Sequence, residues 1–274
     1  MLDIVIIGAG PAGLATALRL HQKGFRPRLY EAVPELKPLG VGVDIKPYAV
    51  KEITEMGLLD AFKAVSVEAR ESIFYTGHGQ QIFAEQCGRH MGYEHDQRFV
   101  HRGRLQMMLY QAVLDRLGRD AVTLGCRCTG FEQDDGGVTV RFDNTHNPAA
   151  PTSLRADVVI GVDGIRSVVR SKLLPASDRT FFSGLTLYRG VTVMPPPSKP
   201  AAAYCTSAIL SARARLSSIR SRIMSTAKAT SSSIGWWSRT RNPRAKRIGT
   251  RRPALKTLNM SSTTANWISW TSAT

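Results

Sequence analysis

Three glycines and one acid near the start of the chain have the spacing of a phosphate-binding turn. The apolar run Ile4–Ile7 leads directly into Gly8, Gly10 and Gly13. Gly8 allows a tight turn, Gly10 lets a pyrophosphate approach the backbone, and Gly13 lets the next helix pack against the strand. Glu31 follows 18 residues after Gly13, where an acid can accept hydrogen bonds from a ribose. A glycine triplet alone could equally be a packing turn, but strand, turn and acid in this order predict dinucleotide binding.

The hydrophobic pattern around this turn predicts the elements that must position it. Residues 11–22 carry apolar side chains one helical turn apart, and Lys23-Gly24 ends that helix. Pro11 and Ala12 begin the helix, so its first N–H groups and its partial positive charge would face the phosphates. Residues 27–31 read as a second strand, which completes the start of a βαβ unit.

A second glycine-containing segment follows the second strand. Gly40, Gly42 and Val43 lie in an apolar stretch that lacks the periodicity of a core element. A loop that must approach a flat ligand closely has this composition, and an ordinary glycine loop is the alternative. A helix over about residues 48–56 is expected next.

The rest of the first 180 residues reads as alternating strands and helices. An amphipathic helix is expected over residues 105–117, directly after His101-Arg102. A buried strand at 156–161 ends in the turn Asp163-Gly164 and leads into a helix from residue 165. The other expected elements are a hairpin over 71–85 and paired strands at 122–131 and 138–142.

The net charge of +16 suggests a nucleic-acid or anionic-surface binder, but its distribution removes that interpretation for most of the chain. Residues 1–178 carry 21 Lys and Arg against 21 Asp and Glu. Residues 179–274 carry the other 16 basic residues and no acid. The chain therefore joins two different compositions.

The cysteines and the apolar segments indicate a cytoplasmic protein. Cys87, Cys126, Cys128 and Cys205 lack the spacing of a zinc site, so buried free thiols in a reducing compartment are expected. The apolar start of the chain lacks a basic leader and contains Asp3, unlike a signal peptide. No apolar run reaches the roughly 18 residues of a membrane span.

Taken in order, these motifs resemble those of the FAD-dependent class A aromatic monooxygenases, the group of salicylate and para-hydroxybenzoate hydroxylases. Within that group the similarity is greatest to the phenazine-1-carboxylate hydroxylase type. The resemblance covers about residues 2–195. It is carried by the glycine turn with Glu31, by Gly40-Val-Gly42-Val43, by His101-Arg102-x-x-Leu105, by Gly161-Val-Asp163-Gly164-Ile-Arg166-Ser167, and more weakly by Leu187-Tyr-Arg189-Gly190.

The resemblance implies a Rossmann-like α/β fold of the glutathione-reductase and para-hydroxybenzoate hydroxylase type. It assigns the ADP half of FAD to Gly8, Gly10, Pro11, Ala12, Gly13 and Glu31, and the flavin side to Gly42, Val43, Arg102, Asp163 and Gly164. The planar fork of Arg102 suits phosphate or ribityl oxygens, and a surface arginine before a helix is the alternative. Arg189 is a candidate for the catalytic face, and a structural arginine on a sheet is equally compatible.

The implied reaction is the hydroxylation of a small aromatic substrate. NADH or NADPH would reduce FAD, and O2 would give the C4a-hydroperoxide that transfers one oxygen atom. No metal, membrane or specific nucleic acid is expected as a partner. A chain that binds FAD without turnover is the first alternative, and nucleic-acid binding by the basic tail is the second.

The resemblance divides the chain into three parts. Residues 1–180 would form the FAD-binding domain, with an excursion at 70–98, and residues 181–198 would begin a β-sheet substrate domain that stays incomplete. Residues 199–274 are rich in Ser, Thr and Arg and are expected to be irregular or disordered. A shift of reading frame near residues 195–205 is the favoured explanation, because a shifted frame permits family-like segments in the right order. The family's second FAD motif, a Gly-Asp segment, has no counterpart.

Overall fold

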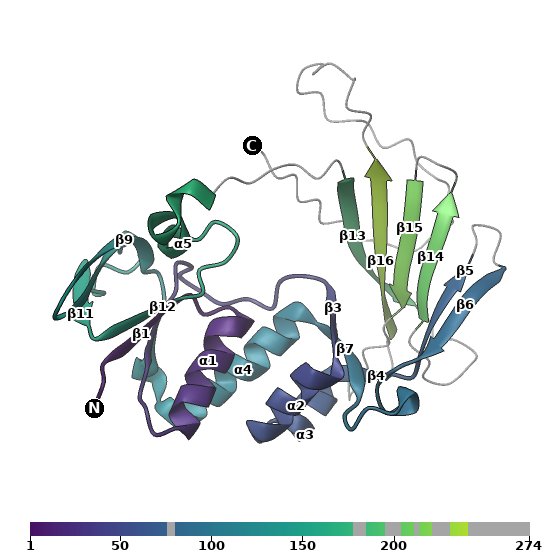
Figure 1. The fold of residues 1–274 in the computed structure, drawn as a ribbon, viewed down its shortest axis with the longest axis horizontal. Helices are drawn as coiled ribbons and strands as arrows, with labels where there is room; N and C mark the ends of the chain where they lie inside the picture. Colours follow the sequence, from purple (N-terminus) through teal and green to yellow (C-terminus); the bar gives the residue numbers. More distant parts are fainter. Residues whose placement is uncertain (76–79, 178–184, 195–203, 211–213, 221–230, 241–274) are drawn as a thin grey trace, which may run out of the picture. The chain divides into compact units, whose positions relative to one another are not determined.

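The computed structural model describes residues 1–75, 80–177, 185–194, 204–210, 214–220 and 231–240, the last four ranges as strands of backbone only. The chain forms two compact units (Figure 1). Unit 1 comprises residues 1–40, 52–64 and 101–180, and unit 2 comprises residues 41–51, 65–100 and 181–274.

Unit 1 is built on a parallel sheet in the order β12-β1-β2-β8. Its strands are β1 (Ile4–Ile7), β2 (Arg28–Tyr30), β8 (Val122–Thr123) and β12 (Val158–Gly161). Val5 is in register with Val159 of β12 on one side and with Arg28 of β2 on the other. β1 is therefore central, which explains its uninterrupted β-branched sequence.

The parallel sheet is covered on both faces. Val5 and Ile7 pack on an antiparallel sheet of β9 (Arg127–Asp134), β10 (Gly137–Asp143) and β11 (Ser153–Ala156). Within that core the rings of Tyr30 and Phe142 stack with centroids 4.8 Å apart. The alternate residues Ile4 and Ile6 point the other way, towards α1 (Pro11–Gln22) and α4 (Arg102–Leu117) (Figure 1).

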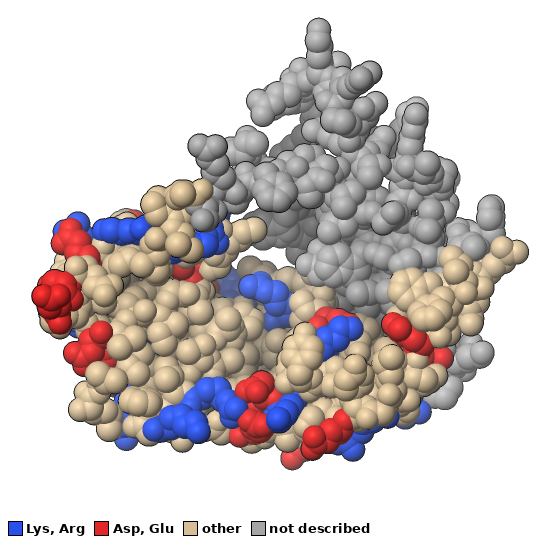
Figure 2. Space-filling model, in the orientation of Figure 1, with Lys and Arg blue, Asp and Glu red and all other residues tan. Residues whose placement is uncertain are grey.

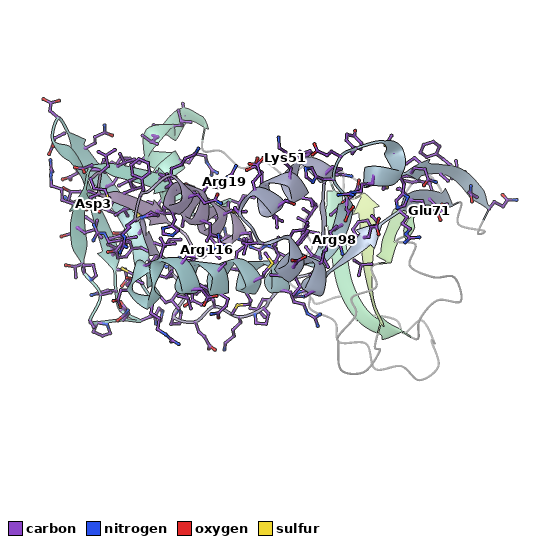
Figure 3. All side chains as sticks on the ribbon, turned by 90° about the horizontal axis from the view of Figure 1, so that it is seen from below. Asp3, Arg19, Lys51, Glu71, Arg98 and Arg116 are labelled. Atoms are coloured by element: carbon purple, nitrogen blue, oxygen red, sulfur yellow. The ribbon has the colours of Figure 1, made fainter. Side chains whose placement is uncertain are left out.

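Two arginines tie the segment 52–64 to these helices. Arg19 of α1 bonds Glu55 at the end of α2 (Pro47–Glu55), and Arg116 of α4 donates to the Met56 carbonyl at 2.8 Å (Figure 3). The same segment contains α3 (Leu59–Val65), whose Phe62 is fully buried. Unit 1 also contains α5 (Val168–Leu173) and short 3-10 turns at Arg119–Ala121 and Pro175–Ser177.

Unit 2 contains three sheets. The first has the order β3-β7-β4, with β3 (Gly42–Ile45), β7 (Gln97–His101) and β4 (Ser66–Ala69). The second is the hairpin of β5 (Glu71–Tyr75) and β6 (Gln81–Gln86), followed by a 3-10 turn at Gly88–Met91. The third is antiparallel, in the order β13-β16-β15-β14, formed by β13 (Leu185–Met194), β14 (Tyr204–Leu210), β15 (Ala214–Arg220) and β16 (Ser231–Thr240).

The observed elements differ from the expected ones in a few places. The loop around Gly42 is a strand, and α4 begins at Arg102 rather than at residue 105. The segments 41–51 and 65–100 belong to unit 2, which therefore includes more of the chain than the expected excursion at 70–98, and that excursion stays a prediction. Strands β14, β15 and β16 lie within the part expected to be irregular. Residues 241–274 of that part lie outside the described residues.

Candidate functional site

The glycine turn lies at the carboxyl end of β1, beside the end of β12. Gly8 has φ +109°, and a Cβ there would lie 2.6 Å from the carbonyl oxygen of Val162. A Cβ at Gly13 would lie 1.9 Å from the carbonyl oxygen of Gly8. Both glycines are therefore required by packing within the chain itself.

Gly10 differs from the other two glycines because no contact among the described residues requires a glycine there. Its φ is −68°, which any residue can adopt, and a Cβ would meet no atom within 4 Å. The space beside Gly10 is therefore open. A glycine in this position keeps the backbone accessible to a ligand.

The helix that follows presents free donors to this space. Pro11 occupies the first turn of α1, where its missing N–H costs nothing. The first α-helical hydrogen bond runs from the Leu14 N–H to the Gly10 carbonyl at 3.0 Å. The N–H groups of Ala12 and Gly13 have no acceptor among the described residues, and such donors at a helix start suit a phosphate. The turn therefore fits the pyrophosphate of a dinucleotide.

Glu31 lies directly after β2 and reaches back to the glycine turn. Its Oε2 accepts the Ala9 N–H at 2.7 Å, and its Oε1 accepts the Val33 N–H at 3.1 Å. The carboxylate has free lone pairs beyond these two bonds. It is thus fixed in position at the end of the strand, where the sequence places a ribose contact.

Asp163 lies on the segment that packs on the glycine turn, but its oxygens are used by α5. They accept hydrogen bonds from the Ser167 hydroxyl at 2.5 Å and from the Val168 N–H at 2.6 Å. Ser167 in turn accepts the Arg170 N–H at 2.9 Å as the N-cap of α5. Asp163 therefore orients the helix, while Gly164 is exposed in the turn with φ +84°.

Arg102 begins α4 with an exposed guanidinium. The aliphatic part of its side chain lies about 3.5 Å from a Cβ built at Gly40, and no hydrogen bond or ion pair holds the guanidinium within the described part of the chain. Its charge is therefore available to a ligand. Gly103 packs so closely on Pro38 that a Cβ there would lie 2.2 Å from the Pro38 carbonyl carbon.

His101 holds the loop before β3 to the start of α4. Its Nε2 lies 2.9 Å from the Gly40 carbonyl oxygen, so Nε2 carries the proton and Nδ1 is a buried acceptor without a hydrogen-bond partner in the described structure. The pKa of His101 lies below its ordinary value, chiefly because the ring is buried. The hydrogen bond to Gly40 raises this pKa, and the nearby charge of Arg104 lowers it. The ring is therefore neutral at pH 7.

The remaining predicted residues lie in unit 2. Gly42 and Val43 are on β3, where the next residue, Asp44, accepts hydrogen bonds from Gln97 at 3.0 Å and from Lys46 at 2.8 Å. Arg189 is on β13, and its side chain lies outside the described residues. Gly42, Val43 and Arg189 stay predictions.

Charge, metal ligands and apolar helices in the described part of the chain bear on three other kinds of site. Acidic and basic side chains are interspersed on the face seen in Figure 2. In the same part, no group of three or more His, Cys, Asp or Glu could hold a metal ion. No helix among the described residues is both long and apolar enough to cross a membrane.

Comparison with known proteins agrees with this geometry. The model of the family described as "FAD binding domain" matches residues 1–257. The chain belongs to the FAD-binding domain family. FAD is thus the cofactor of this family, as the sequence predicted, and the glycine turn as its binding site stays a prediction.

The relatives of this chain include hydroxylases. A phenazine 1,6-dicarboxylic acid hydroxylase of Lysobacter antibioticus is 37% identical over 191 residues, which cover 69% of this chain and 47% of the relative. An FAD-dependent urate hydroxylase of Klebsiella pneumoniae is 30% identical over 198 residues, with the same shares of 69% and 47%. The predicted similarity to aromatic monooxygenases is confirmed, and the chain spans about half the length of these relatives.

Solved structures confirm the fold. Klebsiella pneumoniae HpxO, crystallised with FAD and uric acid, superposes with a TM-score of 0.71 at 23% identity, covering 90% of this chain and 58% of that one. A 2,6-dihydroxypyridine-3-hydroxylase of Arthrobacter nicotinovorans gives a TM-score of 0.66 at 23% identity, covering 87% and 56%. The predicted α/β fold of the FAD-binding domain is correct.

Two residues of this region were missed in the sequence. Gln106 donates a hydrogen bond from Nε2 to the Ala9 carbonyl at 2.9 Å, and His101 was given no role. Gln106 lies four residues after Arg102, so helical periodicity places both on one face of α4. The four-residue spacing from Arg102 could therefore have identified Gln106 as a residue of this site. No local pattern could have paired His101 with Gly40, which is 61 residues away.

Proposed function

We propose that this chain carries the FAD-binding half of an NAD(P)H-dependent aromatic hydroxylase. The observation that carries the proposal is the glycine turn, in which an open Gly10 and unpaired N–H groups at the start of α1 lie beside Glu31. The hydroxylase relatives support the reaction class. The substrate would be a small aromatic or heterocyclic compound, and O2 the source of the oxygen atom.

The roles of the residues follow from their positions. The donors of Ala12 and Gly13 would bind the pyrophosphate, Glu31 the ribose, and Arg102 a phosphate or ribityl oxygen. Gly42 and Val43 would lie against the flavin, Asp163 and Gly164 would lie on the flavin side of the cofactor, and Arg189 would face the substrate. When bound, the flavin supplies the redox and oxygen-transfer chemistry. No nucleophilic side chain of the chain itself is needed.

We assign residues 1–180 to the FAD-binding domain and the strand from residue 185 to the start of the substrate domain. The end of unit 1 at residue 180 supports this division. Three buried free thiols, Cys87, Cys126 and Cys128, support a reducing, cytoplasmic location.

An assay of the purified chain for bound flavin and NAD(P)H oxidation tests the proposed function. The proposal predicts bound flavin, and NAD(P)H oxidation that rises when an aromatic substrate is added. Mass spectrometry would find one atom of ¹⁸O in the product when the gas phase is ¹⁸O2. Flavin binding without stimulated oxidation or product would favour the second candidate, an FAD-binding chain without turnover, which the half-length match to the relatives supports.

A further inference from the structure

We propose that Gln106 is a positioning residue for FAD, because it sets the orientation of the peptide that carries the Gly10 N–H. This inference rests on the proposed function only through FAD binding and needs no turnover. Gln106 lies in the first half of α4, and its side-chain amide donates to the Ala9 carbonyl at 2.9 Å. Ala9 itself is fully buried in the glycine turn.

The two peptides that flank Ala9 are each held by one side chain. The Gly8–Ala9 peptide is held through the Ala9 N–H, which donates to Glu31 at 2.7 Å. The Ala9–Gly10 peptide is held through the Ala9 carbonyl by Gln106. Because β2 and α4 supply these contacts, the turn depends on elements distant in sequence for its conformation.

The Gln106 bond determines where the Gly10 N–H points. In a trans peptide the carbonyl and the N–H point in opposite directions, and no described peptide bond is cis. A carbonyl held towards α4 therefore aims the Gly10 N–H away from α4. That N–H has no acceptor within the described residues, and the space beside Gly10 is open. The donor is available to a phosphate oxygen.

Without Gln106 the turn would have a competing conformation. A buried carbonyl without a donor is unfavourable. The peptide can relieve this by rotating at Gly10, whose φ is the least restricted. The Ala9 carbonyl would then accept an N–H of the first turn of α1. That rotation would misdirect the Gly10 N–H and would occupy a second phosphate donor.

The same bond fixes α4 against the turn. Gln106 and Arg102 are separated by four residues, so they share one face of the helix. The bond between Gln106 and Ala9 therefore sets the rotation of the helix that presents Arg102. Loss of Gln106 is expected to weaken two contacts to the cofactor rather than one.

The test compares Gln106→Leu with Gln111→Leu in the full chain. Gln111 is on the same helix and is exposed, and among the described residues its side chain bonds Asp115 alone, at 2.8 Å, so it is a matched control. FAD and ADP are titrated by fluorescence and calorimetry. Gln106→Leu should raise both dissociation constants by at least about tenfold, the effect of one lost hydrogen bond, whereas Gln111→Leu should leave them unchanged.

Gln106→Glu separates positioning from a general loss of stability. An ionised glutamate cannot donate to the Ala9 carbonyl, whereas a protonated one can. The dissociation constant of Gln106→Glu for FAD, divided by that of the wild type, should therefore fall as the pH is lowered from about 7 to about 4, through the ordinary glutamate pKa of about 4.3.

Three results would overturn the inference. One is a Gln106→Leu variant that melts at a lower temperature but binds FAD and ADP within about twofold of the Gln111→Leu control. Another is a Gln106→Glu ratio that does not change with pH. A wild-type chain that binds neither FAD nor ADP contradicts both this inference and the proposed function, whereas binding without turnover contradicts only the latter.

Discussion

At the scale of single residues, the three glycines of the turn divide into two kinds. Gly13→Ala would place a Cβ 1.9 Å from the Gly8 carbonyl oxygen, so it should lower both the free energy of unfolding, by about 1–3 kcal/mol, and FAD affinity. Gly10→Ala meets no atom within 4 Å, so it should lower only FAD affinity, with a change in unfolding free energy below about 1 kcal/mol. Urea unfolding of the apoprotein and FAD titration measure the two effects.

Gly130→Ala is the matched control for both substitutions. Gly130 also has open space around it, but it lies on β9, away from the turn. Gly130→Ala should change neither the free energy of unfolding nor the FAD affinity appreciably. Equal FAD affinity in Gly10→Ala and Gly130→Ala would show that no ligand approaches the backbone at Gly10.

The pKa of His101 predicts a pH-dependent stability. In the folded chain that pKa lies below the ordinary 6.5 because burial disfavours the cation. As the pH falls, the unfolded chain therefore protonates His101 at a higher pH than the folded chain does. The contribution of neutral His101 to the free energy of unfolding is complete above pH 6.5 and is lost as the pH falls through the folded pKa. In His101→Gln, an amide can still donate to Gly40 without titrating. The loss of unfolding free energy between about pH 7.5 and about pH 5.5 should be smaller in this variant, and equal losses in urea unfolding would contradict the assignment.

The sequence predicted the geometry of the glycine turn wherever the signal was local. Gly8, Gly13 and Glu31 were identified from spacing alone, because each is needed within one βαβ unit. Gln106 and His101 act through carbonyls 97 and 61 residues away, so their partners depend on the packing of α4. Asp163 was assigned to the cofactor, but its oxygens accept hydrogen bonds from α5. Sequence spacing cannot distinguish an aspartate that holds a helix from one that contacts a cofactor.

At the scale of elements, Asp163 should matter to α5 before it matters to any ligand. Asp163→Ala removes the acceptor of Ser167 and Val168, so it should lower the free energy of unfolding by about 1–2 kcal/mol. Asp163→Asn keeps one acceptor oxygen and should cost less. Urea unfolding of the apoproteins checks that Asp163→Ala loses more unfolding free energy than Asp163→Asn. Reduced FAD affinity with unchanged apoprotein stability would instead indicate that Asp163 contacts only the cofactor.

The contact between the parallel and antiparallel sheets of unit 1 should protect two thiols. Cys126 is 1% exposed and Cys128 is 6% exposed, and burial raises the pKa of Cys126 from 9.0 to about 11. That shift alone lowers its thiolate fraction near neutral pH by about 100-fold. In a Cys205→Ser background, labelling by a thiol reagent should therefore be slow in the native chain and rapid in urea. Rapid native labelling of Cys126 would show that the two sheets do not pack as described.

Element boundaries were predictable where the pattern was strong. The buried strand β1 and the helix α1 match the expected ranges because an apolar run and a Lys-Gly end bound them clearly. The strand β3 was read as a loop because Gly42 is a weak strand former and because its partner β7 lies more than 50 residues away. Pairing at that distance leaves no local trace in the sequence.

At the scale of the whole molecule, the chain combines a complete glycine turn with about half the length of its relatives. The 16 basic residues beyond residue 178 belong to the part whose side chains are not described. The expected shift of reading frame near residues 195–205 stays a prediction. The coding DNA would contradict it if no single-base shift restored a family-like sequence.

The most direct test of the central claim is a titration of the purified chain with FAD. The account predicts saturable binding of one FAD per chain, with a changed flavin spectrum, competition by ADP, and weaker binding in Gly10→Ala. A chain that leaves the flavin spectrum unchanged, or that binds FAD as well after Gly10→Ala, would contradict the claim that the turn at Gly8–Gly13 is the cofactor site.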